Sequence, residues 1–122
     1  MPTFFDTYAL IEFLGGRQEF RRHAAQGIVT TRWNLAELLV VDLRDRGEDA
    51  ARNDFRRFLG ACADVKDEDL WDAARFRHEK RRRGRRFSFP DALGYTVARR
   101  LGLRFVTGDD PFRGLPGVLF QK

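Results

Sequence analysis

The fold is indicated first by the stretch PTFFDTYALIEFLGG, which covers residues 2–16. Its apolar beginning predicts a short buried strand over Thr3–Phe5, and the residues that follow predict a helix over Tyr8–Leu14 that ends at two glycines. Asp6 therefore falls at the carboxyl end of a strand, in apolar surroundings. An ionised carboxylate in such surroundings is destabilising unless it is paired, hydrogen-bonded or bound to a metal ion.

Three further acids have a similar apolar context. Glu37 interrupts the run LAELLVV, Asp91 lies within FPDAL, and Asp109 follows FVTG. These stretches contain no equal set of lysines and arginines that could pair with the acids. Because hard divalent cations prefer oxygen ligands, the four carboxylates predict a metal site.

The rest of the chain alternates predicted strands and helices. The expected strands are Thr3–Phe5, Gly27–Thr30, Arg104–Thr107 and Val118–Phe120. The expected helices are Tyr8–Leu14, Arg17–Ala25, Arg32–Arg46, Glu48–Cys62, Asp67–Arg83 and Ser88–Leu101. This order predicts an α/β fold: a three-layer sandwich with a central, mostly parallel sheet of about four to five strands flanked by helices. We expect one domain over residues 1–122, with no internal repeat.

The predicted topology gives the acids a common place. In open parallel sheets, ligands bind beyond the carboxyl ends of the strands. Asp6 and Asp109 both leave strands in that direction, while Glu37 and Asp91 lie near helix N-termini that can face the same edge. Spacing along the chain indicates this convergence without proving it.

Composition restricts the partners and the compartment. The net charge of +5 is concentrated in Arg75–Arg86, where eight Lys or Arg residues oppose one Glu. Such a segment indicates a polyanionic partner, although a solvated helix end is the alternative. Cys62 is the only cysteine, which fits a reducing cytoplasm. No apolar stretch approaches the roughly 20 residues that span a membrane, so we expect a cytoplasmic protein without a membrane partner.

Together these motifs resemble the PIN domain family, and the likeness covers essentially the whole chain. They are a strand leading into Asp6, a helix with Glu37 in an apolar context, SFPDAL around Asp91, and FVTGDDPF around Asp109. The length is similar to that of the VapC-like toxin ribonucleases of type II toxin–antitoxin pairs. The resemblance implies an Mg²⁺- or Mn²⁺-dependent endoribonuclease, commonly a homodimer, that a cognate antitoxin holds inactive.

The resemblance also implies roles for individual residues. Asp6, Glu37, Asp91 and Asp109 match the family's four catalytic, metal-binding acids, and Thr7 and Thr107 match its supporting hydroxyl positions. Asp110 competes with Asp109 for the fourth position and is retained as a supporting residue. Arginines close to the third acid are expected to contact RNA phosphates, an antitoxin or only solvent; they are Arg81, Arg82, Arg83, Arg85 and Arg86.

Other interpretations stay open. Asp6 is also a candidate N-cap, Asp91 is a candidate member of a capping box with Ser88, and Asp109 is a candidate turn or N-cap residue before Pro111. At the level of function, the alternatives are a catalytically inactive PIN-like module that binds nucleic acid or protein, and a metal-dependent phosphatase or DNA nuclease. The phosphatase lacks support because no second Asp follows Asp6 in an Asp-x-Asp pair.

Overall fold

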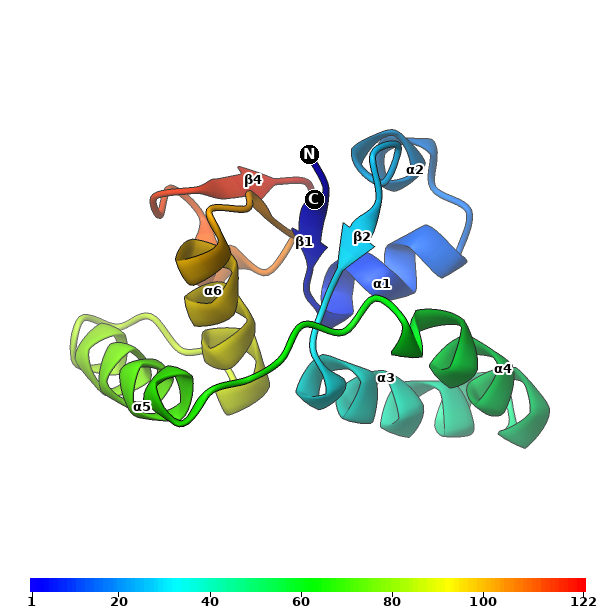
Figure 1. Cartoon of the computed structure of the whole chain (residues 1–122), viewed down its shortest axis with the longest axis horizontal. Helices are drawn as coiled ribbons and strands as arrows, with labels where there is room; N and C mark the ends of the chain where they lie inside the picture. Colours follow the sequence, from blue (N-terminus) through cyan, green and yellow to red (C-terminus); the bar gives the residue numbers. More distant parts are fainter.

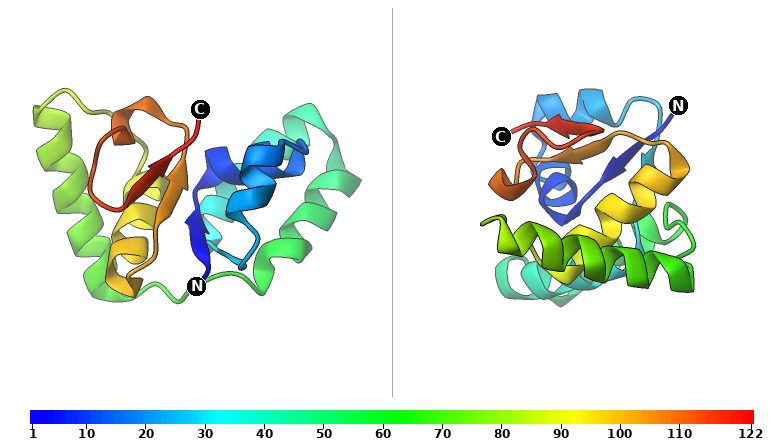
Figure 2. Two further views of the ribbon diagram at one scale, coloured as in Figure 1. Left: turned by 90° about the horizontal axis from the view of Figure 1, so that it is seen from above. Right: turned by 90° about the vertical axis from the view of Figure 1, so that its left-hand side faces the viewer.

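The computed structural model describes residues 1–122 as a parallel sheet between two layers of helices (Figure 1; Figure 2). The strands are β1 (Thr3–Phe5), β2 (Ile28–Val29), β3 (Phe105–Thr107) and β4 (Val118–Phe120), in the order β2-β1-β3-β4. Every neighbouring pair is parallel. The predicted α/β sandwich is therefore confirmed, with four strands.

The helices cover both faces of this sheet. They are α1 (Thr7–Leu14), α2 (Gln18–His23), α3 (Arg32–Asp45), α4 (Glu48–Leu59), α5 (Asp67–Arg82), α6 (Phe89–Leu101) and the short 3₁₀ helix η1 (Asp110–Phe112). Figure 2 shows α5 and α6 on one side of the strands and α1 to α4 on the other. None of the helices is long and apolar enough to cross a membrane.

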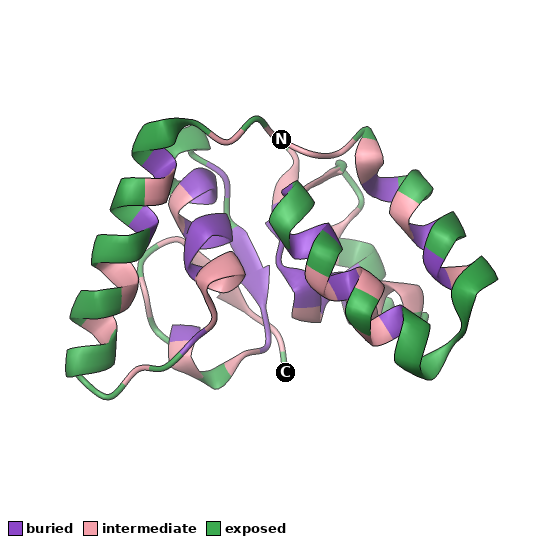
Figure 3. Ribbon diagram, turned by 90° about the horizontal axis from the view of Figure 1, so that it is seen from below, coloured by how far each residue is buried: buried purple, intermediate pink, exposed green.

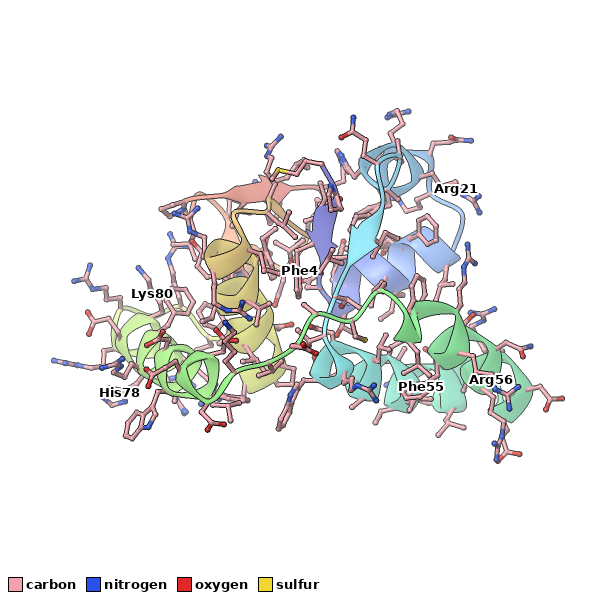
Figure 4. The ribbon with its side chains drawn as sticks, in the orientation of Figure 1. Phe4, Arg21, Phe55, Arg56, His78 and Lys80 are labelled. Carbon is pink, nitrogen blue, oxygen red and sulfur yellow. The ribbon has the colours of Figure 1, made fainter.

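Alternation along the strands divides the core between the two layers. Phe4 and Phe105 belong to a cluster with residues of α5 and α6, whereas Phe5 and Val106 belong to a second cluster with residues of α1, α3 and α4. Successive strand side chains point to opposite faces, so both faces of β1 and β3 must be apolar. Figure 3 shows buried residues along the inward sides of the helices, and Figure 4 shows Phe4 in the interior.

The predicted ends of β2 and α4 were wrong for the same reason. The second strand was expected to include Thr30, but the structure ends β2 at Val29, and Thr30 forms an isolated bridge with Cys62. Its hydroxyl donates to the Phe5 carbonyl at 2.9 Å. Helix α4 therefore ends at Leu59 rather than at Cys62, because the chain must extend to reach Thr30.

The sheet register fixes where the site forms. Phe4 pairs with Phe105 and Phe5 with Val106, so the residues that follow both strands leave the sheet at the same edge. Helix α6 approaches β1 and α3 closely at Gly94, where an added Cβ would lie 2.9 Å from the Phe4 ring and 3.1 Å from Asn34 Oδ1. A glycine here lets the start of α6 lie against the start of α3.

Candidate active site

Asp6 is the most buried of the four predicted acids. It follows β1 directly and is the N-cap of α1, where Oδ1 accepts a hydrogen bond from the Ala9 N–H at 2.8 Å. Its other oxygen, Oδ2, accepts from the Thr107 hydroxyl. The side chain is inaccessible to solvent. The capping interpretation is therefore confirmed. A carboxylate oxygen can accept two hydrogen bonds, and each Asp6 oxygen accepts one here, so lone pairs are left for another ligand.

Thr107 joins the ends of β1 and β3. Besides donating to Asp6, its hydroxyl accepts from the Asp109 N–H at 3.0 Å. The chain then turns at Gly108, where a Cβ would overlap the Tyr8 ring. Asp109 follows as a half-buried residue before η1, and its side chain caps no helix. The turn is thus held by Thr107, and the Asp109 carboxyl group is left without a capping role.

Glu37 is held from the opposite layer. It lies in the second turn of α3, half-buried, and its Oε1 accepts from the Thr7 hydroxyl at 3.2 Å. That hydroxyl is also 3.1 Å from the Asn34 carbonyl and accepts from Asn34 Nδ2 at 3.4 Å. Asn34 is fully buried and accepts from the Thr31 hydroxyl at 2.7 Å. A buried polar chain therefore connects the start of α1 with the start of α3.

Asp91 enters from the first turn of α6. The Ser88 hydroxyl caps this helix by accepting from the Asp91 N–H at 3.2 Å. The reciprocal bond from the Ser88 N–H to the Asp91 carboxylate, which a complete capping box needs, is absent. The carboxyl group is therefore free to face the other acids. Burial raises the pKa values of Asp91 and Glu37, and the polar Ser88 hydroxyl opposes both shifts.

The four carboxyl groups lie close enough for the charge of one to shift the pKa of another. Burial raises the Asp6 pKa well above its usual value, and the nearby charge of Asp91 raises it further. Burial and the charges of Glu37 and Asp109 raise the pKa of Asp91 to about 7. Burial also raises the pKa values of Glu37 and Asp109. The structure thus brings together four acids that lie far apart in sequence.

No cation neutralises this cluster. None of the four carboxyl groups takes part in an ion pair. Their oxygens are the donor type that Mg²⁺ and Mn²⁺ prefer. As the side chains lie, no three of them are placed to hold one ion together. Ligation by this set would therefore need water molecules as further ligands, which Mg²⁺ commonly retains.

Asp110 is oriented toward different partners. Its carboxyl group forms ion pairs with Lys122 at 2.9 Å and with Arg113 at 3.4 Å, on an exposed surface. No hydrogen bond joins it to the other acids. This arrangement leaves Asp109 as the acid that lies near Asp91, and its charge raises the pKa of Asp91 in addition to the effects of burial and of Glu37.

The predicted basic segment is divided in the structure. Arg81, Arg82, Arg83 and Arg86 are exposed. Arg85 is half-buried, and its Nη1 donates to the carbonyls of Pro111 and Arg113 at 2.7 and 2.9 Å. Arg85 therefore anchors this segment to the loop that follows Asp109, which brings the exposed arginines to the side of the molecule that carries η1.

One polar residue of the site was not predicted. Asn34 donates to the Thr7 hydroxyl that holds Glu37, yet it was assigned no role, whereas Ser88 caps α6 as expected. The signal for Asn34 was its position one turn before Glu37 on the same helical face. Its burial depends on packing against β1, which local sequence does not show.

Comparisons with known proteins agree with this geometry. The PIN domain family model matches residues 3–118. A toxin–antitoxin complex from Klebsiella pneumoniae is similar in structure, with 21% identity, a TM-score of 0.73 and coverage of 96% of this chain and 95% of that one. VapBC2 from Rickettsia felis, bound to a promoter DNA fragment, has 16% identity, a TM-score of 0.75 and coverage of 99% and 98%.

A third similar structure is VapC20 from Mycobacterium tuberculosis, a toxin that cleaves the sarcin-ricin loop, with 22% identity, a TM-score of 0.72 and coverage of 95% and 98%. At these identities the structures are evidence for a shared fold. No curated protein sequence matches the chain significantly. The match to the family model over nearly the full length is decisive: the chain belongs to the PIN domain family.

Proposed function

We propose that this PIN domain is a VapC-like endoribonuclease that hydrolyses RNA phosphodiester bonds with Mg²⁺ or Mn²⁺. One observation supports this most strongly: Asp6, Glu37, Asp91 and Asp109 lie together, from both helical layers and two strand ends, without a pairing cation. Buried acids that have a structural purpose are normally paired. An unpaired group of four has the chemistry of a site that takes its positive charge from a ligand.

The residues of the site divide into ligands and positioning residues. The four acids would hold the metal in part through water molecules, and the metal when bound would supply positive charge for the phosphoryl oxygens and activate a water molecule. Thr107 orients Asp6, and Thr7 orients Glu37, through the hydrogen bonds described above. The Ser88 hydroxyl is engaged as the cap of α6, and no Cys or His lies among the site residues, so water is assigned as the attacking group. RNA phosphates are assigned to the exposed arginines of residues 81–86.

We extend the proposal to the biological setting. The fold is that of the toxin–antitoxin structures compared above, which supports a cognate antitoxin as partner. We also propose a homodimer that acts in the cytoplasm, where its RNA substrate is found. An inactive PIN-like binding module is the alternative, and an activity assay separates the two.

The first experiment is RNA cleavage by purified, antitoxin-free protein. A mixed pool of structured RNAs is incubated with Mg²⁺ or Mn²⁺, with EDTA as the metal-free control. We expect Asp6→Asn to reduce cleavage by more than the roughly 10- to 100-fold typical of residues that only orient metal ligands. The matched control is Asp72→Asn, which changes an exposed acid on α5.

Three results would overturn the proposal. Equal cleavage by wild type and Asp6→Asn would place the activity elsewhere or in a contaminant. Cleavage that persists in EDTA would exclude the metal. Absence of cleavage by folded protein that binds Mn²⁺ and RNA would favour the binding module.

A further inference from the structure

Trp33 is an exposed tryptophan next to the acid site. It occupies the first turn of α3, and 44% of its surface is accessible to solvent. Its ring lies against Phe89 in an edge-to-face arrangement, with 6.1 Å between ring centroids and 76° between planes. An exposed indole with one edge held by a neighbouring ring keeps an oriented, accessible surface.

The location of this aromatic pair is tied to the acids. Trp33 and Glu37 are four residues apart on α3, so they share one helical face. Phe89 is the first residue of α6 and directly follows Ser88, whose hydroxyl accepts from the Asp91 N–H. The same two helices meet at this aromatic pair and again where Gly94 of α6 approaches Asn34 of α3. Trp33 thus lies about one helical turn, or 5.4 Å along the axis, before Glu37, and Phe89 holds its ring at the contact between α3 and α6.

Resting on the proposed nuclease function, we propose that Trp33, braced by Phe89, stacks on an unpaired RNA base adjacent to the phosphate that is cleaved. A single nucleotide can span from an aromatic surface to a phosphate one helical turn away. Single-stranded RNA is commonly recognised by bases stacked on aromatic side chains. Trp33 would then contribute to the choice of cleavage position, which the acids alone cannot determine.

The positive charge beside Trp33, and its difference from other exposed apolar residues of α3, favour RNA over a protein as the partner at this position. Arg32 precedes Trp33, is exposed and forms no ion pair, so it offers positive charge to a phosphate backbone. Farther along α3, Val40 and Leu43 are exposed apolar residues, and Leu43 lines a pocket with Phe55 of α4, an arrangement more typical of a protein contact. Trp33 differs from them because Phe89 fixes its ring beside the acids.

The chain permits a direct fluorescence test. Trp33 and Trp71 are the only tryptophans, so in a Trp71→Phe background the emission reports Trp33 alone. The probe is a short unstructured RNA, added in EDTA so that no cleavage occurs, with inorganic polyphosphate as a probe that lacks bases. We expect RNA to quench the emission and polyphosphate to leave it nearly unchanged, because only a base can stack.

Affinity measurements complete the test. Trp33→Leu keeps the apolar bulk but removes the aromatic face, and we expect it to weaken RNA binding roughly 5- to 150-fold, the loss typical of one stacked base. Trp33→Phe should retain most of the affinity. The matched control is Trp71→Leu on α5, which is 65% exposed and should bind RNA like the wild type. Circular dichroism verifies that each variant is folded.

The outcomes separate stacking from catalysis. Equal quenching by RNA and polyphosphate, or equal affinities of Trp33→Leu and Trp71→Leu, would overturn the stacking proposal even if the protein cleaves RNA. A Trp33→Leu protein that loses an oligomer, seen by light scattering, but keeps its RNA affinity would assign Trp33 to a protein interface instead. Base-dependent quenching without cleavage in Mn²⁺ would support stacking and contradict the nuclease.

Discussion

Asp69 and the site acids differ in their partners: Asp69 forms an ion pair with an arginine, and the site acids form none. Asp69, in the first turn of α5, is 2% exposed and accepts two hydrogen bonds from Arg100 on α6, at 2.9 and 2.8 Å. It also accepts from the Lys66 N–H at 2.8 Å. Although burial raises its pKa, these hydrogen bonds bring the pKa below the usual value. The site acids have no arginine, and their pKa values are raised.

The difference separates stability from function. A carboxylate that links two helices is stabilised by a partner cation within the protein. The acids at the ends of β1 and β3 are held in place by hydroxyl groups but form no ion pair within the protein. This is expected where a ligand brings the positive charge. Asp42 and Asp54 are an intermediate case, because both lie near the single guanidinium of Arg46.

The sharpest test exchanges one acid of each kind for its neutral amide. Asp109→Asn should reduce RNA cleavage at least about 100-fold and leave the free energy of unfolding unchanged or higher, because an unpaired charge is removed. Asp69→Asn should lower the free energy of unfolding by about 2–4 kcal/mol and leave cleavage by the folded fraction intact. Urea titrations and cleavage rates measure both. Loss of stability in Asp109→Asn would break the comparison.

Metal addition tests the uncompensated charge directly. Mn²⁺ at about 100 times its dissociation constant should stabilise the wild type by about 2.7 kcal/mol, because it binds only the folded site. Asp91→Asn should lose most of this gain, and Asp72→Asn should retain it. Thermal unfolding with Mn²⁺ and with EDTA provides the measurement. A gain of the same size in Asp91→Asn would place the ion elsewhere.

The same contrast applies to the arginines. Arg85→Ala should cost about 1–2 kcal/mol of stability, because two backbone carbonyls of the loop after Asp109 lose their donor. Arg82→Ala should leave stability unchanged, weaken RNA binding and reduce the slope of log affinity against log salt by about one. Both variants are compared in urea titrations and RNA-binding assays. An unchanged salt slope for Arg82→Ala would remove Arg82 from the RNA surface.

The smallest expected effect is a change in the pH dependence of stability, caused by Asp42 beside Asp54. Burial and the neighbouring Asp54 raise the pKa of Asp42 to about 6, and Arg46 opposes the shift. The folded state therefore binds this proton more tightly than the unfolded state, so the contribution of Asp42 to stability is full at acid pH and is lost as the pH rises through about 6. Asp42→Asn should flatten this part of the pH profile in EDTA. Asp72→Asn, on the exposed side of α5, should not.

Local sequence was enough for several elements of the fold. The bounds of β1 and β4 match the predicted ones, because each is a short apolar run between clear breaks. The caps at Thr31 and Ser88 were likewise readable from residue type and spacing. The ends of β2 and α4 were not, because the bridge between Thr30 and Cys62 depends on chain segments that meet only after folding.

The sequence by itself determined the acids, their apolar context and the family likeness, because each depends on residue type and local order. Only the tertiary structure decided how the polar groups around the acids connect, since Asn34 on α3 donates to Thr7 on α1. It also directed Asp110 toward Lys122 and used Arg85 to hold a loop. Side-chain partners of this kind depend on distances between elements far apart in the chain, which spacing along the sequence does not contain.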